Sequence, residues 1–198
     1  MERRLPPGSH GIPADVVARN QRERLVAAMA EVCAQKGYAG ASVAEVAKRA
    51  GVSSVTFYKQ FADKRECMLA AHRQLLGRLL DEVDRVGEHE VGRAKTRTRI
   101  QAVLSLLSAD PPSARLLAVE ILAVGPEGSE RHAAAVGELA TRLRAGSEAV
   151  ADPPLSTAEW ARAAGMLALI GRLVMGGEAA RLPELEDELV AVAAGEPG

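Results

Sequence analysis

Residues 42–61 read SVAEVAKRAGVSSVTFYKQF and contain the signals for two short helices joined by a tight turn. Ser42 followed by Glu45 is a capping-box pattern, in which the serine oxygen and the glutamate carboxylate accept hydrogen bonds from amides at a helix start. Gly51 interrupts this helix, and Ser53 then offers an N-cap for a second one that runs through Phe61.

The side chains of this stretch fall into a buried and an exposed group. Two helices that cross closely need a small residue at the crossing and a residue that tolerates positive φ in the turn, and Ala47 and Gly51 meet these needs. We expect the apolar residues Val46, Ala50, Val52 and Phe57 to form a small core. The second helix is then left with polar side chains that suit base edges and phosphates in a DNA major groove: Ser53, Ser54, Thr56, Tyr58 and Lys59.

Helical spacing of apolar residues extends through the rest of the chain, and strand-like alternation is not convincing anywhere. The sequence predicts one helix from Pro13–Asp15 to Gly37 and a long one from Asp63 to Val86. Beyond a polar break at 87–92 it predicts helices over 93–108, 113–124, 129–150 and 156–176, and a last short one after Pro183. The expected fold is all-α.

The charge distribution separates a basic head from an acidic body. Residues 1–65 hold 11 Lys and Arg against 6 Asp and Glu, whereas residues 66–198 hold 14 against 20. We therefore expect a flexible arm at 1–14, a DNA-binding domain at 15–66, a helical regulatory and dimerisation domain at 67–194, and a tail at 195–198.

Composition and motifs argue against several classes of protein. No apolar run approaches the roughly 20 residues of a membrane span, and no secretory signal is evident, so a cytoplasmic protein is expected. Hydrolase, metalloprotease and nucleotide-binding motifs are missing, which predicts a non-enzyme with no cofactor and no metal. Cys33 and Cys67 are read as small buried hydrophobes, and His72, His89 and His132 as surface or satisfied core residues.

The segment from about Arg24 to Leu80 resembles the DNA-binding region of the tetracycline-repressor (TetR) family of bacterial regulators. The shared pattern is a Ser or Thr cap, then AxxAGVS, an aromatic-Tyr-x-x-Phe group and a charged xDK turn. Here it reads as Ser42, Ala47, Ala50-Gly51-Val52-Ser53, Phe57-Tyr58, Phe61 and Asp63-Lys64.

The resemblance implies roles for single residues. Thr56, Tyr58 and Lys59 would face DNA, Ser53 would cap the recognition helix, and Ser42 and Lys64 would hold phosphates. Val55 stands where many relatives have a glycine close to DNA, and Ala44 where many have an arginine that reaches bases. The predicted DNA-binding set is Ser42, Ser53, Ser54, Val55, Thr56, Tyr58, Lys59 and Lys64. Arg3, Arg4, Arg19 and Arg22 either touch the DNA or belong to a solvated arm.

The body supplies a predicted dimer interface and a predicted pocket. Residues 160–175 are apolar on almost every side, so with the helix at 185–192 they form either a two-fold four-helix interface or plain intramolecular core. Candidate walls of an effector pocket are Leu79, Leu106, Leu116, Leu117, Ile121, Leu122, Trp160 and Met166. Because rings are so scarce there, an aliphatic or flexible ligand is favoured.

The predicted function is that of a dimeric, sequence-specific DNA-binding transcriptional regulator. Its partners would be a palindromic operator and a small hydrophobic effector, with the long helix at 63–86 carrying the signal between them. Repression relieved by the effector is the expected logic, although activation fits the same residues. The alternative is a non-catalytic helical scaffold that uses the basic head to contact other proteins.

Overall fold

The computed structural model describes residues 13–86, 89–144 and 154–195, and every regular element in these ranges is helical, as predicted. The elements are α1 (Ala14–Gly40), α2 (Val43–Arg49), α3 (Ser54–Gln60), α4 (Lys64–Arg85), α5 (Gly92–Ala109), α6 (Pro111–Ala118), the 3₁₀ helix η1 (Glu120–Val124), α7 (Pro126–Leu143), α8 (Thr157–Met175), the 3₁₀ helix η2 (Ala179–Leu185) and α9 (Glu186–Ala194).

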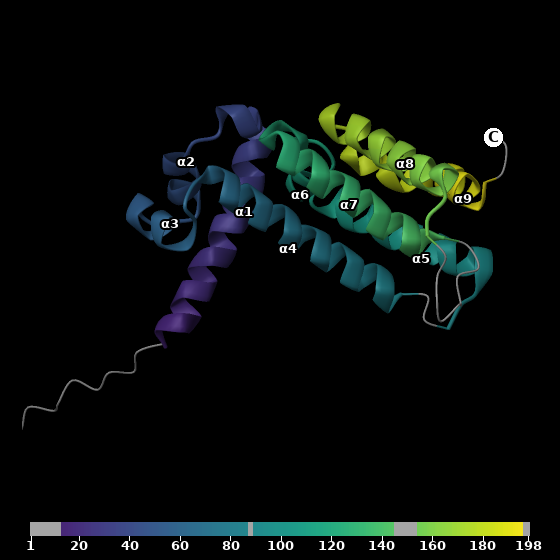
Figure 1. Ribbon diagram of the computed structural model, residues 1–198, viewed down its shortest axis with the longest axis horizontal. Helices are drawn as coiled ribbons and strands as arrows, with labels where there is room; N and C mark the ends of the chain where they lie inside the picture. The colour runs from purple at the N-terminus through teal and green to yellow at the C-terminus, as the bar shows by residue number, and fades with distance from the viewer. Residues whose placement is uncertain (1–12, 87–88, 145–153, 196–198) are drawn as a thin grey trace, which may run out of the picture.

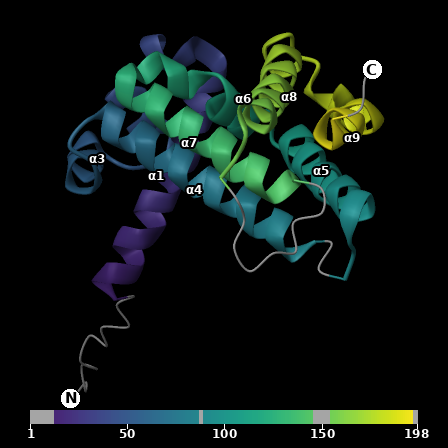
Figure 2. The same cartoon turned by 45° about the vertical axis from the view of Figure 1, so that its right-hand side comes forward.

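The helices form a small head and a larger body joined by α4. α2 and α3 lie at one end of the molecule beside α1, whose first turns project away from the body (Figure 1). Turning the molecule shows α4 running from this head along the body, with α8 and α9 together on the far side (Figure 2). In the described residues no helix is both long and apolar enough to cross a membrane.

The helices of the head begin where the capping residues predict. The Oγ of Ser42 accepts from the Glu45 amide at 3.3 Å, within a complete capping box, and the Oγ of Ser53 accepts from the Thr56 amide at 3.1 Å. The Asp63 carboxylate accepts from the Glu66 amide at 2.8 Å. These bonds satisfy amides that a first helical turn leaves without a partner, so each short helix has a defined start.

The predicted helix at 113–124 is wrong in two respects, and prolines explain one of them. Pro111 and Pro112 begin α6 instead of preceding it. Proline is tolerated there because the amides of a first helical turn have no hydrogen-bond acceptor within the helix, so a missing amide hydrogen costs nothing. α6 then ends at Ala118, and a separate 3₁₀ turn, η1, follows. Pro126 likewise begins α7, which ends at Leu143, whereas residues 145–150 of the predicted helix lie outside the described part of the chain.

Head and body share one continuous hydrophobic core. Leu25 of α1, Phe57 of α3, Met68 of α4, Leu116 of α6 and Ile170 of α8 all belong to the same buried cluster. α1 packs on α6 and η1 of the body as well as on α2, α3 and α4. A displacement of α4 or α6 is therefore transmitted to the head, because side chains in a close-packed interior move together.

Candidate nucleic-acid interface and effector pocket

The recognition helix α3 is fixed by two buried aromatic rings. Phe57 and Phe61 are at most 2% exposed and their ring centroids lie 5.7 Å apart, so both belong to the core, as predicted for Phe57. Arg22 lies over the Phe61 ring at 4.2 Å and donates to the Gln60 carbonyl at 2.7 Å. Arg22 thus holds the end of α3, a role that neither of its two predicted alternatives included.

The turn before α3 depends on Gly51, which has φ of +65°. Arg24 of α1 donates to the carbonyls of Ala50 and Gly51, with a length of 2.8 Å to Gly51, and so satisfies the end of α2. A Cβ added to Gly51 would lie 2.7 Å from the Arg24 Nη2. Nothing local in the sequence points to this role of Arg24, since its partners are 26 and 27 residues away.

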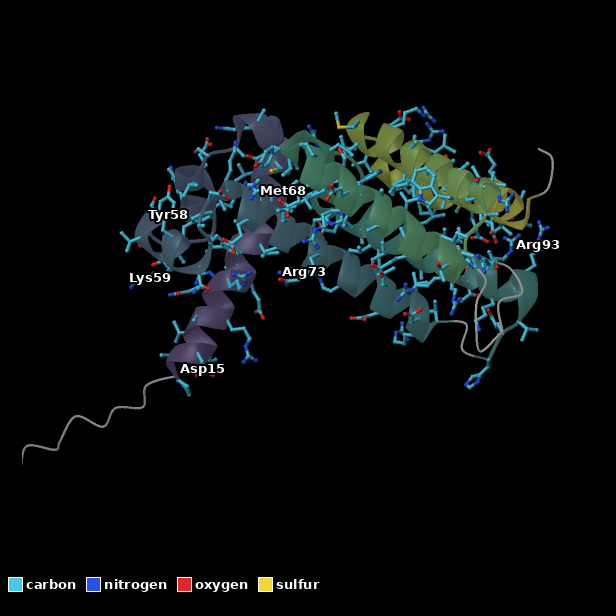
Figure 3. The ribbon with its side chains drawn as sticks, viewed as in Figure 1. Asp15, Tyr58, Lys59, Met68, Arg73 and Arg93 are labelled. Carbon is cyan, nitrogen blue, oxygen red and sulfur yellow. The ribbon has the colours of Figure 1, made fainter. Side chains whose placement is uncertain are left out.

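The outer face of α3 carries the predicted DNA-binding side chains. Ser53, Ser54, Val55, Tyr58 and Lys59 are exposed. Val55 and Tyr58 are 66% and 59% exposed. Tyr58 and Lys59 project from the end of the head, away from the body (Figure 3).

Thr56 lies differently from its neighbours on α3. It is half-buried, and its hydroxyl lies 3.0 Å from that of Ser53. The exposed face as a whole presents hydroxyls, a phenol, an ammonium and an isopropyl group, which together can meet phosphates, base edges and thymine methyls.

The other two predicted phosphate ligands lie at helix starts beside α3. Ser42 is exposed and caps α2. Lys64, at the start of α4, donates from Nζ to the carbonyls of Tyr38 at 3.0 Å and Ala41 at 2.9 Å, and it lies over the Tyr38 ring. Its ammonium therefore closes the end of α1, and a phosphate contact would have to displace these bonds.

An apolar pocket lies inside the body between α4, α5, α6, α7 and α8. The cavity itself has a volume of about 40 Å³, and about 560 Å³ is free of atoms when the adjoining space open to solvent is included. The predicted residues Leu79, Leu117 and Met166 line it. Further lining comes from His72, Leu76, Val103, Leu107, Ala114, Ala118, Ala135, Leu139, Leu143, Ala163, Leu167 and Ile170.

The other predicted pocket residues lie elsewhere. Leu106 precedes the lining residue Leu107 by one position, about 100° around the helix, and with Arg78 it borders an adjoining surface groove that shares Leu79, Leu107 and Leu117 with the pocket. Ile121 and Leu116 are fully buried in core, whereas Leu122 and Trp160 are 45% and 40% exposed. Periodicity predicts which helices have apolar faces but does not show which neighbour each face meets.

His72 is the pocket residue that sequence reasoning misplaced. It is 2% exposed, and its Nε2 has no hydrogen-bond partner, so it is neither a surface nor a satisfied core histidine. Burial, reinforced by His132 and Arg131, lowers the pKa of His72 to about 4. The ring is therefore neutral at pH 7. His89, by contrast, is exposed, whereas His132 is half-buried and its Nδ1 has no hydrogen-bond partner, so the prediction for His132 is also wrong.

A break in α1 connects the head to the body. Gly37 has φ of +71°, which leaves the Tyr38 amide free to donate to the Glu120 carboxylate of η1 at 2.7 Å. Glu120 is buried and also accepts from the Arg115 Nε at 2.7 Å, and Arg115 donates on to the Ala34 carbonyl at 3.1 Å. A charged pair of the body thus holds the backbone of the head.

Both cysteines are buried and free, as predicted. Burial is the main cause that raises the pKa of Cys33 to about 11 and that of Cys67 to about 12. Because the thiolate is the reactive form, neither side chain suits redox chemistry or metal binding at neutral pH. Among the described residues no group of three or more His, Cys, Asp or Glu could hold a metal ion.

The fold has counterparts among solved regulators. FadR from Bacillus subtilis, solved in complex with stearoyl-CoA, matches with a TM-score of 0.72 and 20% identity, over 88% of this chain and 99% of that one. A transcriptional regulator from Rhodococcus sp. RHA1 matches with a TM-score of 0.63 and 27% identity, over 88% and 94%. The first of these likenesses shows a shared fold alone.

Sequence comparison also finds bacterial regulators among the relatives of this chain. The fatty acid metabolism regulator protein of Bacillus subtilis (strain 168) is 27% identical over 88 residues, which are 44% of this chain and 45% of that protein's length. The family described as "Bacterial regulatory proteins, tetR family" matches residues 25–71, which include α2, α3 and the start of α4. Residues 25–71 of the chain therefore carry the DNA-binding region of the tetR family of bacterial regulatory proteins, which are DNA-binding transcription regulators and not enzymes.

Proposed function

We propose that this regulator is a homodimeric repressor that binds a palindromic operator. It releases the operator when a long-chain acyl-CoA binds in the apolar pocket of the body. One observation carries the proposal: the walls of the apolar pocket include α4 and α6, and both helices also pack on α1 of the head. The FadR protein of similar fold, solved with stearoyl-CoA, supports the class of effector. An interaction scaffold would need neither the pocket nor the exposed polar face of α3.

The exposed side of α8 supports a dimer. Its inner side is buried, but Leu169 and Met175 are 37% and 49% exposed on the outer side, and Trp160, which is 40% exposed, lies about half a turn around the helix from Leu169. A Cβ added to Gly165, on the outer side near Leu169, would meet no atom within 4 Å. A second copy that covers this side would bury these residues and bring two recognition helices to one operator, which multiplies affinity. α9 offers less, since Leu189 and Val190 are already buried within the chain.

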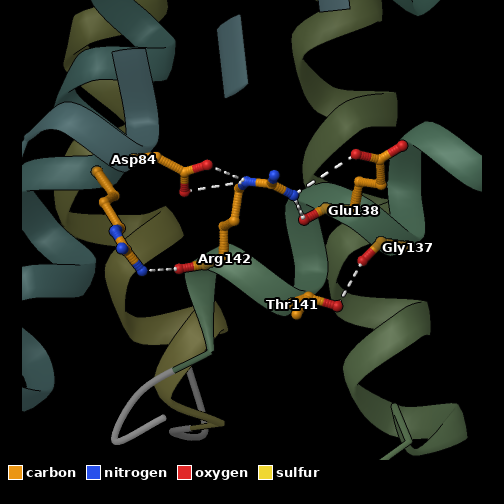
Figure 4. A network of polar contacts seen from close by, with 6 residues as sticks. Asp84, Gly137, Glu138, Thr141 and Arg142 are labelled. Atoms are coloured by element: carbon orange, nitrogen blue, oxygen red, sulfur yellow. Dashed lines mark hydrogen bonds and ion pairs between the residues drawn. The ribbon is translucent and has the colours of Figure 1, made fainter. Parts of the chain in front are cut away.

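Helix α4 supplies one route from pocket to DNA. His72, Leu76 and Leu79 line the pocket from its middle, and its first residue follows the turn after α3. Its far end is held by Arg142 of α7, whose Nε donates to both Asp84 oxygens at 2.9 and 3.0 Å (Figure 4). Because this end is held, a ligand that moves the middle of α4 displaces the end near the head.

Contacts between α6 and α1 supply a second route. Ala114, Leu117 and Ala118 line the pocket from α6, and Arg115, on the same helix, bonds Glu120 and the Ala34 carbonyl. A ligand that shifts α6 therefore pulls on α1 at its break. Both heads of a dimer must meet major grooves about 34 Å apart, so a small change of this kind releases DNA.

The test is footprinting on the DNA that flanks its own gene, followed by operator titration with and without stearoyl-CoA. We expect one protected near-palindromic site and an operator affinity that falls about 5- to 150-fold with the ligand, the usual range of coupling. Free coenzyme A is the control and should have no effect. Leu117→Trp should fill the pocket and abolish the response while leaving operator binding intact. Stearoyl-CoA that binds the protein without changing operator affinity would refute the proposal.

A further inference from the structure

The pocket combines an aliphatic wall with a single polar side chain. Of the described residues that line it, only His72 is not Leu, Ile, Val, Met or Ala. It comes from α4 and lies beside Leu76 and Leu79 on the same wall. A cavity that bound only a saturated chain would have no use for an imidazole, because an unpartnered buried polar group costs free energy.

Among the side chains that line the pocket, the unpartnered atom is the Nε2 of His72. It is buried, and no donor or acceptor of the described chain lies within hydrogen-bond reach of it. Buried polar groups in native proteins are satisfied in the large majority, so each exception calls for a ligand, a water or another explanation. Because the residue is 2% exposed and forms part of the pocket wall, whatever satisfies this nitrogen must enter the pocket.

The surroundings of His72 define the chemistry of the missing partner. His132 and Arg131 of α7 are its titratable neighbours, and both disfavour a positive charge on its ring. The pKa of His132 is itself lowered, mainly by burial. A neutral imidazole beside other cationic or neutral groups offers one donor or one acceptor at Nε2, depending on the tautomer. A hydroxyl can satisfy either form, since it both donates and accepts.

We propose that His72 hydrogen-bonds a hydroxyl group on the effector's chain, so that the regulator senses hydroxylated acyl chains in preference to saturated ones. The inference rests on the proposed function, namely that an aliphatic effector occupies this pocket. The aliphatic wall binds the chain, and the position of His72 along it selects where the hydroxyl lies. A site built to bond a hydroxyl discriminates against the analogue that lacks it, because the polar atom is then left unpaired.

The test compares dodecanoic acid with a panel of dodecanoic acids that carry one hydroxyl at successive carbons. Calorimetric titration of the full chain should find at least one isomer that binds about tenfold more tightly than dodecanoic acid, the effect of one hydrogen bond. His72→Leu should remove that preference and bind dodecanoic acid at least as well as the wild type does. His72→Gln, which keeps a donor and an acceptor, should retain part of it.

His89→Leu is the control, because His89 is an exposed histidine outside the pocket lining. It should leave the preferred isomer unchanged. Dodecanoic acid that binds the wild type better than every isomer would overturn the inference and leave a buried water as the partner of His72. So would an isomer preference that survives in His72→Leu. Failure of every fatty acid and of stearoyl-CoA to bind would instead refute the proposed function.

Discussion

Gly51 serves two purposes at the turn between α2 and α3. Its φ of +65° suits glycine, and its missing side chain leaves room for the Arg24 guanidinium that caps α2. Gly51→Ala should therefore destabilise the protein by roughly 2 kcal/mol in urea unfolding, from backbone strain and the displaced arginine. Gly77→Ala is the control: its Cβ would meet nothing within 4 Å inside α4, so it should add up to about 1 kcal/mol of stability. Equal effects of the two changes would contradict this reading.

The pKa of His72 makes stability depend on pH. The ring titrates near 6.5 in an unfolded chain, whereas burial lowers the pKa of His72 to about 4 in the folded one. Between these values the unfolded state binds more protons, so stability falls as the pH drops from about 6.5 to 4. Urea unfolding at pH 7 and 4.5 should show a smaller loss in His72→Leu than in the wild type, by up to about 3 kcal/mol. Parallel losses in both proteins would contradict the assignment.

The recognition helix carries two kinds of contact that binding experiments can separate. Lys59 is exposed, and its ammonium suits a DNA phosphate, which is the same at every base pair. Lys59→Ala should therefore weaken binding to all DNA sequences alike and lower the salt dependence of binding by about one phosphate contact. Val55 exposes an apolar group suited to a thymine methyl, and Val55→Ala should lose affinity for one base position only. Titrations of operator and mutated operators at two salt concentrations distinguish them. Equal sequence dependence in both variants would remove α3 from base recognition.

The junction of η1, α6 and α1 should set the strength of the effector response. Glu120→Ala leaves the Tyr38 amide without its acceptor and Arg115 without its carboxylate. We expect about 1–3 kcal/mol of destabilisation and a reduced ratio of operator affinities with and without stearoyl-CoA. Arg85→Ala, which breaks an exposed pair with Glu82, is the control and should leave that ratio unchanged. An unchanged ratio in Glu120→Ala would assign the coupling to α4 alone.

For the whole molecule, the open side of α8 predicts the oligomeric state. Gly165→Leu adds a side chain where nothing in the chain opposes it, so the fold should be retained. In a dimer closed over α8 the same side chain would hold the two copies apart. Sedimentation should then show a monomer with wild-type helicity and with operator affinity reduced by tenfold or more, since one reading head remains. A Gly165→Leu protein that stays dimeric would place the interface elsewhere.

Local interactions of a few residues made much of the head predictable. The caps at Ser42, Ser53 and Asp63 involve partners three residues away, and the positive φ of Gly51 belongs to the turn itself. Such features can be read from short spacings because the chain brings the groups together without help from the rest of the fold. The all-α class and the exposed polar face of α3 follow in the same way from periodicity.

Contacts between residues far apart in sequence were decided by the tertiary structure alone. The Glu120 carboxylate accepts from the Tyr38 amide, 82 residues away in sequence, and Arg24 of α1 caps the C-terminal end of α2. Whether an apolar face meets a cavity, a core or another copy depends on which helices surround it, so Leu79 and Leu117 line the pocket while Ile121 does not. The unpartnered nitrogen of His72 also depends on the tertiary structure, because only the packing of helices can remove a side chain from water without supplying a hydrogen-bond partner.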